Sequence, residues 1–110
     1  MEPKLCGLLG IARRAGHLTV GFDAVRSALL TGHAQLVLLA ADCSPKTEKE
    51  LRFTGRESTC PLIKLPADKA ALAAALGMEK PVAVVATDDR GFATAMQKHC
   101  GTDTKEDVAL

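Results

Sequence analysis

The sequence predicts an α/β protein, a three-layer α/β/α sandwich around a four-stranded sheet. Two unbroken apolar runs, Gln35–Ala41 and Pro81–Thr87, are typical of strands that are covered on both faces. Segments with helical spacing of apolar residues alternate with these and two shorter strand-like runs, which gives the element order αβαβαβαβα. Regular alternation of helices and strands favours helices packed on both faces of one sheet.

Glycine, proline and capping residues predict where the elements begin and end. Pro3 suits the first turn of a helix, and Ser44 before Pro45 is an N-cap signature. Glycines follow most of the helical segments, where helices commonly end. In order, the expected elements are a helix from Pro3 closed by Gly16, a strand at His17–Val20, a helix at Phe22–Thr31, the strand Gln35–Ala41, a helix at Lys46–Thr54, a strand at Cys60–Leu65, a helix at Asp68–Leu76, the strand Pro81–Thr87, and a helix capped by Asp88 or Asp89 that keeps its period to His99. Pro61 in the third strand indicates either an edge position in the sheet or the first residue of the strand.

Composition predicts one domain at residues 1–100 followed by a loosely ordered polar tail at 101–110. The chain has 110 residues, 47% of them hydrophobic, and a net charge of +1, so polyanion binding would need a local basic patch. There is no Trp or Tyr and there are three Phe, which predicts an aliphatic core and argues against aromatic platforms for stacking nucleobases. No signal peptide or membrane-length apolar run is visible, so we expect a cytoplasmic protein without membrane contact.

Catalytic and metal sites are not expected. The sequence lacks the GxGxxG and GxxxxGK[ST] phosphate-binding motifs. Cys43 with His17 or His33 as base is a conceivable nucleophile, but a buried thiol explains Cys43 better. A zinc site built on His99 and Cys100 fits poorly, because adjacent residues rarely share a metal. We therefore predict no enzymatic activity, no cofactor and no metal.

Anion binding is the better-supported chemistry. A helix that opens at Gly21, just after a strand, offers free backbone N–H groups at Gly21–Ala24 and about half a positive charge. Arg13 and Arg14 close the preceding helix, and Lys80 precedes the last strand. Helices that follow strands begin at the strands' carboxyl edge, so we expect these groups to converge there.

Three stretches carry a resemblance to a known family: LLGIARRAG, GHAQLVLLAADCSPKT and VAVVATDDRGFA. The chain resembles the bacterial YlxQ-type proteins, a branch of the superfamily of the archaeal large-subunit ribosomal protein called seven-Ae, over nearly its whole length to about residue 99. The resemblance implies a mixed sheet and RNA binding without catalysis. Better-studied members bind kink-turns, which are sharply bent duplex RNAs with tandem sheared G·A pairs.

The resemblance also implies which residues contact RNA. Its Gly-x-Asn-Glu-x-x-Lys pattern falls on Gly21 and, at the polar positions, on Asp23, Ala24 and Ser27, while its apolar loop falls on Leu76–Val82. The amide, the carboxylate and the cation of the pattern are therefore missing, although Arg26 lies one residue from the lysine position. The expected RNA-binding residues are Gly21, Phe22, Asp23, Ala24, Arg26, Ser27, Arg13, Arg14, Met78 and Lys80.

These features favour a ribosomal-protein-like RNA-binding protein that acts on structured, kink-turn-like RNA, including ribosomal RNA, in a ribosome, translation or transcription context. Ribosomal or transcription-machinery proteins are the expected protein partners. The alternative is a protein-binding adaptor that keeps the fold and has lost kink-turn recognition. A weaker third interpretation is a recognition module like that fused to some RNA methyltransferases.

Overall fold

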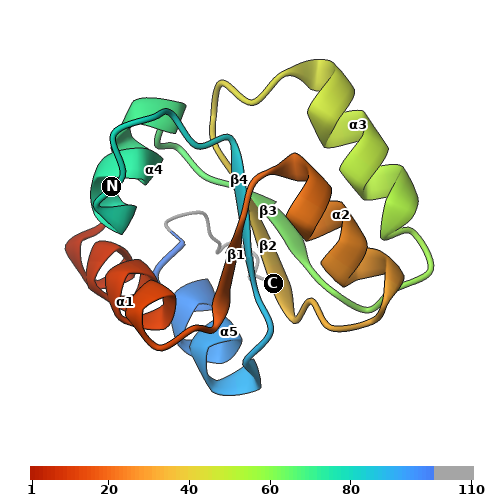
Figure 1. The fold of residues 1–110 in the computed structure, drawn as a ribbon, viewed down its shortest axis with the longest axis horizontal. Coiled ribbons are helices and arrows are strands. Elements are labelled where there is room, and N and C mark those ends of the chain that lie inside the picture. Colours follow the sequence, from red (N-terminus) through yellow and green to blue (C-terminus); the bar gives the residue numbers. More distant parts are fainter. Residues whose placement is uncertain (101–110) are drawn as a thin grey trace, which may run out of the picture.

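A four-stranded sheet lies between two layers of helices (Figure 1). The computed structural model describes residues 1–100, so the tail expected at 101–110 lies outside the described residues. The predicted fold class and element order are confirmed. The elements are α1 (Pro3–Arg14), β1 (Leu18–Val20), α2 (Phe22–Leu30), β2 (Leu36–Leu39), α3 (Pro45–Thr54), β3 (Leu62–Lys64), α4 (Lys69–Leu76), β4 (Val84–Thr87) and α5 (Arg90–Gln97).

The sheet is mixed, with the strand order β1-β4-β2-β3. β4 runs antiparallel to both β1 and β2, whereas β2 and β3 are parallel. The two apolar runs therefore form the inner strands as neighbours, with Leu38 opposite Val85 and Leu39 opposite Val84. β3 lies on an edge, which agrees with the position expected from Pro61.

Each face of the sheet has its own apolar core. Leu36 and Leu38 of β2 pack with α1, α4 and α5, whereas Val37 and Leu39 point to the opposite face and pack with α2 and α3. This division follows from the two-residue period of a strand. Figure 1 shows the same arrangement, with α1, α4 and α5 on one side of the sheet and α2 and α3 on the other. Both cores are mainly aliphatic, as predicted.

The strands are shorter than the apolar runs that predicted them. After β2 the chain leaves the sheet, because the Ala41 N–H donates to the carbonyl of Ala67 instead of a neighbouring strand. Before β4, the Val82 N–H donates to the carbonyl of Lys69 in α4. Ala40 after β2 and Val82 before β4 lie outside the strands, but their side chains are still buried in the core. Within residues 1–100, no helix has the length and apolar character needed to cross a membrane.

Candidate functional site

The N-terminus of α2 lies at the carboxyl end of the edge strand β1. Gly21 forms the N-cap with φ +99° and ψ 159°, a conformation that suits glycine because it has no Cβ. Its carbonyl accepts the first helical hydrogen bond from Val25 at 3.0 Å. No side chain caps α2, whereas Glu2, Ser44, Asp68 and Asp89 cap the other four helices of residues 1–100.

One of the backbone donors expected to be free is in fact occupied. The Gly21 N–H donates to the carbonyl of Val84 at 3.0 Å, so the expectation for this residue is wrong. The antiparallel pairing of β1 with β4 continues one residue beyond β1 and consumes this donor. The N–H groups of Phe22, Asp23 and Ala24 have no acceptor among residues 1–100, so three donors remain at the positive end of the helix.

The same hydrogen bond brings the loop before β4 to the start of α2. Because Val84 opens β4, the segment 77–83 runs into the sheet beside Gly21. Within this loop Lys80 is exposed, whereas Met78 is half-buried and packs against the core beneath α1 and α4. Of these two predicted contact residues, Lys80 presents its side chain to solvent and Met78 contributes mainly to packing.

Arg13 is anchored to the other end of this loop. Its guanidinium Nη1 donates to the carbonyl of Leu76, the last residue of α4, at 2.8 Å. This contact ties the C-terminal turn of α1 to the C-terminal turn of α4, which a solvated arginine would not do. Arg14 instead folds back over its own helix, since a Cβ at Gly10 would lie 3.4 Å from Arg14 Nη1. Both arginines are therefore exposed, but only Arg13 is anchored to a second helix.

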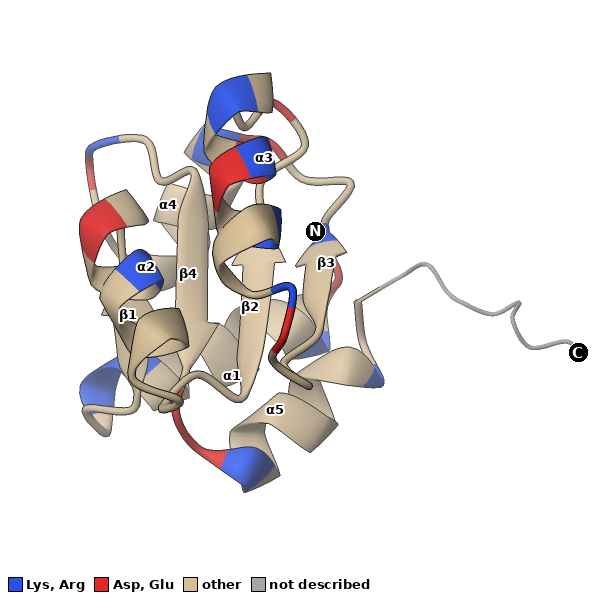
Figure 2. Cartoon of the chain, turned by 90° about the vertical axis from the view of Figure 1, so that its right-hand side faces the viewer, with Lys and Arg blue, Asp and Glu red and all other residues tan. Residues whose placement is uncertain are grey.

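The predicted contact residues on α2 differ in what they present. Phe22 is half-buried against the core beneath α2, so its backbone N–H is the group available to a ligand. Asp23, Ala24, Arg26 and Ser27 are all exposed. Figure 2 shows acidic and basic residues interleaved over α2 and α3. Side chains of both charges therefore lie around the start of α2. The free backbone N–H groups add partial positive charge that no side chain of the helix cancels by capping.

A concavity of about 490 Å³ with a mixed polar and apolar lining lies beside α2 and was not predicted from the sequence. Ala24, Ser27, Ala28 and Thr31 line its helical side, and Thr19, His33, Ala34, Ala86, Thr87 and Asp88 complete it. At its edge the His17 ring nitrogen Nδ1 lies 2.9 Å from Asp88. Asp89, and not Asp88, caps α5 by accepting from the Phe92 N–H at 2.8 Å. Only a long-range pairing of β1 with β4 assembles this concavity, so no local pattern signals it.

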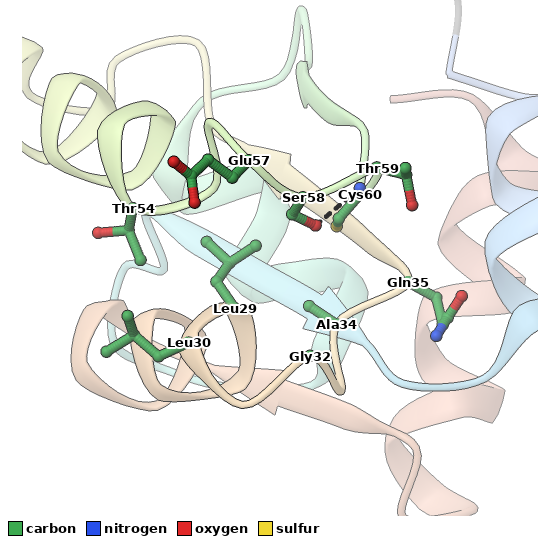
Figure 3. A pocket seen from close by; sticks show the side chains of 10 residues that line it. All are labelled: Leu29, Leu30, Gly32, Ala34, Gln35, Thr54, Glu57, Ser58, Thr59 and Cys60. Carbon is green, nitrogen blue, oxygen red and sulfur yellow. Dashed lines mark hydrogen bonds between the residues drawn. The ribbon is translucent and has the colours of Figure 1, made fainter.

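A second concavity, of about 480 Å³, is lined by residues at the ends of α2 and α3 and before β3 (Figure 3). It carries no catalytic pair. Burial raises the pKa of the Cys60 thiol to about 11, with a smaller opposing effect from the Val37 N–H. A thiol with this pKa stays protonated near neutral pH and is a poor nucleophile.

The contacts of Cys43 do not support a nucleophile, and those of Cys100 do not support a zinc site. Cys43 is buried, which raises the pKa of its thiol, and its Sγ lies 3.6 Å from the carbonyl of Ser44. Cys100 is buried as well, and its Sγ donates to the carbonyl of Met96, while His99 lies 3.4 Å from Glu2. In residues 1–100 no group of three or more His, Cys, Asp or Glu side chains could hold a metal ion.

Residues 4–97 match the model of the Ribosomal protein L7Ae/L30e/S12e/Gadd45 family. The chain belongs to this family. The RNA-binding protein YlxQ of Bacillus subtilis (strain 168) is 37% identical over 93 residues, which span 81% of this chain and 87% of that protein. The sequence resemblance to the YlxQ-type branch is thereby confirmed.

Solved structures support the family fold. A protein of unknown function from Bacillus halodurans superposes with a TM-score of 0.83 at 29% identity, over 92% of this chain and all of its own. A 15.5kD RNA binding protein of Giardia lamblia superposes with a TM-score of 0.72 over 88% of this chain and 85% of its own. At 21% identity the latter likeness concerns the fold alone.

Proposed function

We propose that this family member is a non-catalytic, cytoplasmic RNA-binding protein that recognises structured RNA through the start of α2 and the loop before β4. The observation that carries the proposal is the uncapped N-terminus of α2, held beside that loop by the Gly21–Val84 hydrogen bond. Three unpaired N–H groups at a helix N-terminus suit a phosphate of the RNA backbone. The RNA-binding relative in Bacillus subtilis supports the same class of ligand.

Positive side chains extend the proposed contact beyond one phosphate. Arg26 is exposed on α2, Arg14 on α1 and Lys80 in the loop before β4. Arg13 is also exposed and still has guanidinium donors beyond the one bound to Leu76. Asp23 opposes these cations, because its carboxylate lies in the first turn of α2. Contacts to backbone and shape therefore dominate, as is common for duplex RNA.

The RNA class that fits best is a kink-turn or a similarly bent duplex. Such RNA brings phosphates of two helical arms close together, and the protein offers donors on both α2 and the loop before β4. Ribosomal RNA is the abundant source of such structures, and proteins of the ribosome or the transcription machinery are the corresponding partners. Neither a cofactor nor a membrane has a role in this proposal.

A salt-dependent titration tests the function. Wild type and Arg26→Gln are titrated with a kink-turn hairpin and with a plain duplex of equal length. Arg90→Gln is the matched control, because Arg90 is exposed on α5 in the opposite helical layer. We expect saturable binding that favours the kink-turn, and a salt slope that Arg26→Gln makes shallower by roughly 0.7–0.9. Equal loss in Arg90→Gln would place the contact elsewhere, and no salt-sensitive binding to either RNA would favour the protein-binding adaptor.

A further inference from the structure

We propose that Phe53 stacks against an unpaired base of the bound RNA, with Arg26 and Lys49 contacting the phosphates beside that base. The inference rests on the proposed function, because it adds a second contact to the RNA that α2 binds. It concerns the outer face of the α2–α3 layer, where the two helices pack against each other.

Phe53 is exposed where an aromatic residue would normally be buried. Its side chain is 63% exposed at the C-terminal end of α3. The other two aromatic side chains of the chain, Phe22 and Phe92, pack against the two apolar cores. Phe53 is thus an exposed aromatic ring in a chain whose low aromatic content argues against stacking platforms. A flat apolar ring open to solvent is the element that binders of unpaired nucleotides use.

Arg56 holds the Phe53 ring in one orientation. Its guanidinium carbon lies 3.9 Å from the ring centroid, and its Nη1 donates to the Phe53 carbonyl at 2.8 Å. The cation therefore covers one face of the ring and is fixed there by the hydrogen bond. A ring that is already oriented loses less conformational freedom when a base stacks on it.

The concavity beside the ring has the composition expected for a nucleotide. It measures about 380 Å³ and is lined by Arg26, Lys49, Glu50, Phe53 and Thr54. Arg56 is not among these residues, so the space adjoins a part of the ring that its guanidinium leaves open. Two cations on the lining suit phosphates on either side of a stacked base. Glu50 carries the one negative charge of the lining and should weaken the contact.

Charge and position favour RNA over a protein as the occupant. Arg56 covers the ring and two further cations line the concavity beside it, against the single carboxylate of Glu50 in that lining. Arg26 belongs both to this concavity and to the proposed surface on α2, so the two are continuous. Thr54 also lines the neighbouring concavity, and Glu57 is part of that lining (Figure 3). The charge of Glu57 directs a phosphate chain away from that concavity and toward Arg26.

Fluorescence tests the stacking directly, because the chain contains no Trp or Tyr. Phe53→Trp gives a single reporter on the platform. Ile11→Trp gives the matched control on α1, where Ile11 is 49% exposed in the opposite helical layer. The probes are a blunt kink-turn hairpin and the same hairpin with a short unpaired adenosine tail. We expect the tailed hairpin to quench Phe53→Trp and the blunt hairpin to leave it bright. Ile11→Trp should respond to neither.

Affinity measurements separate this inference from the proposed function. Phe53→Ala should weaken binding of the tailed hairpin on the order of tenfold and leave the blunt hairpin unchanged, whereas Glu50→Gln should tighten the tailed complex. Ile11→Ala is the control for loss of an exposed apolar side chain. Equal affinity of wild type and Phe53→Ala for the tailed hairpin overturns the stacking alone. Absence of binding to both hairpins by wild type overturns the proposed function with it. Self-association that Phe53→Ala abolishes identifies a protein interface and also overturns the stacking.

Discussion

The backbone N–H of Gly21 lies 3.0 Å from the carbonyl oxygen of Val84 and donates a hydrogen bond to it. This bond connects the N-cap of α2 with the first residue of β4, two segments that lie far apart in the sequence. It fixes which backbone donors of α2 face solvent and which loop lies beside them. The geometry of the proposed RNA contact therefore depends on a glycine in an unusual conformation.

Replacing Gly21 with Ala should destabilise the protein through backbone strain. At φ +99° an L-residue is disfavoured, and we expect a loss of about 1–3 kcal/mol in the free energy of unfolding. Gly7→Ala is the matched control in α1, since an added Cβ meets no atom within 4 Å at either position. It should gain up to about 1 kcal/mol from helix propensity. Urea unfolding measures both, and equal effects would contradict the role of the Gly21 conformation.

The inner strands should tolerate truncation poorly. Leu38 of β2 and Val84 of β4 are almost fully buried in different cores. Replacing either with Ala should cost roughly 1–4 kcal/mol, because apolar contacts are lost and a cavity remains. Ile11→Ala on the surface should change stability by less than about 1 kcal/mol. Chemical denaturation of the three variants checks the comparison, and values near zero at both strand positions would contradict the sheet order.

The half-buried thiol of Cys60 should make stability fall at alkaline pH. Burial raises the pKa of this thiol from its ordinary 9.0 to about 11 in the folded protein. Between these values the unfolded chain loses the proton first and binds fewer protons, so the free energy of unfolding decreases as pH rises. Cys60→Ala removes this dependence, so the stability difference between wild type and the variant should shift between about pH 9 and 11. A constant difference over that range would contradict the partial burial of the thiol.

Two substitutions should strengthen binding of a kink-turn. Asp23→Asn removes a negative charge from the first turn of α2 and restores an amide donor. Ser27→Lys adds a cation one turn further along the helix, at an exposed position. We expect each change to tighten binding several-fold, and Ser27→Lys to steepen the salt slope by roughly 0.7–0.9. A protein-binding adaptor predicts that neither substitution creates or alters saturable RNA binding.

Local patterns carry much of the fold and less of the candidate site. The apolar runs around Leu38 and Val84 predict the inner strands because burial on both faces leaves no polar positions. Pro61 likewise predicts an edge strand because it cannot donate to a neighbour. By contrast, the contact of Arg13 with Leu76 joins residues on two helices, and no spacing in the sequence encodes it.

The missed features have the same physical origin. The Gly21 donor is consumed because β4 enters the sheet beside β1, and strand order is a property of the whole chain. Phe53 follows the buried Leu51 and the exposed Arg52, so the residues beside it in the sequence do not indicate whether it is buried. Its exposure depends on how α2 and α3 pack. Sequence reasoning identified the start of α2 because the glycine and the strand before it are adjacent.

The position of β4 has a consequence for synthesis on the ribosome. Of the strands in residues 1–100, β4 is the last to be made, yet it pairs with β1 and β2 and fills the centre of the sheet. Before it emerges, β1 has no partner and the apolar sides of α1 and α2 have no continuous surface to cover. Pairings between distant segments form slowly because a long loop must close first. The nascent chain should therefore fold late and in one step, and the free backbone N–H groups of Phe22, Asp23 and Ala24 should take their final arrangement only when translation has passed Thr87.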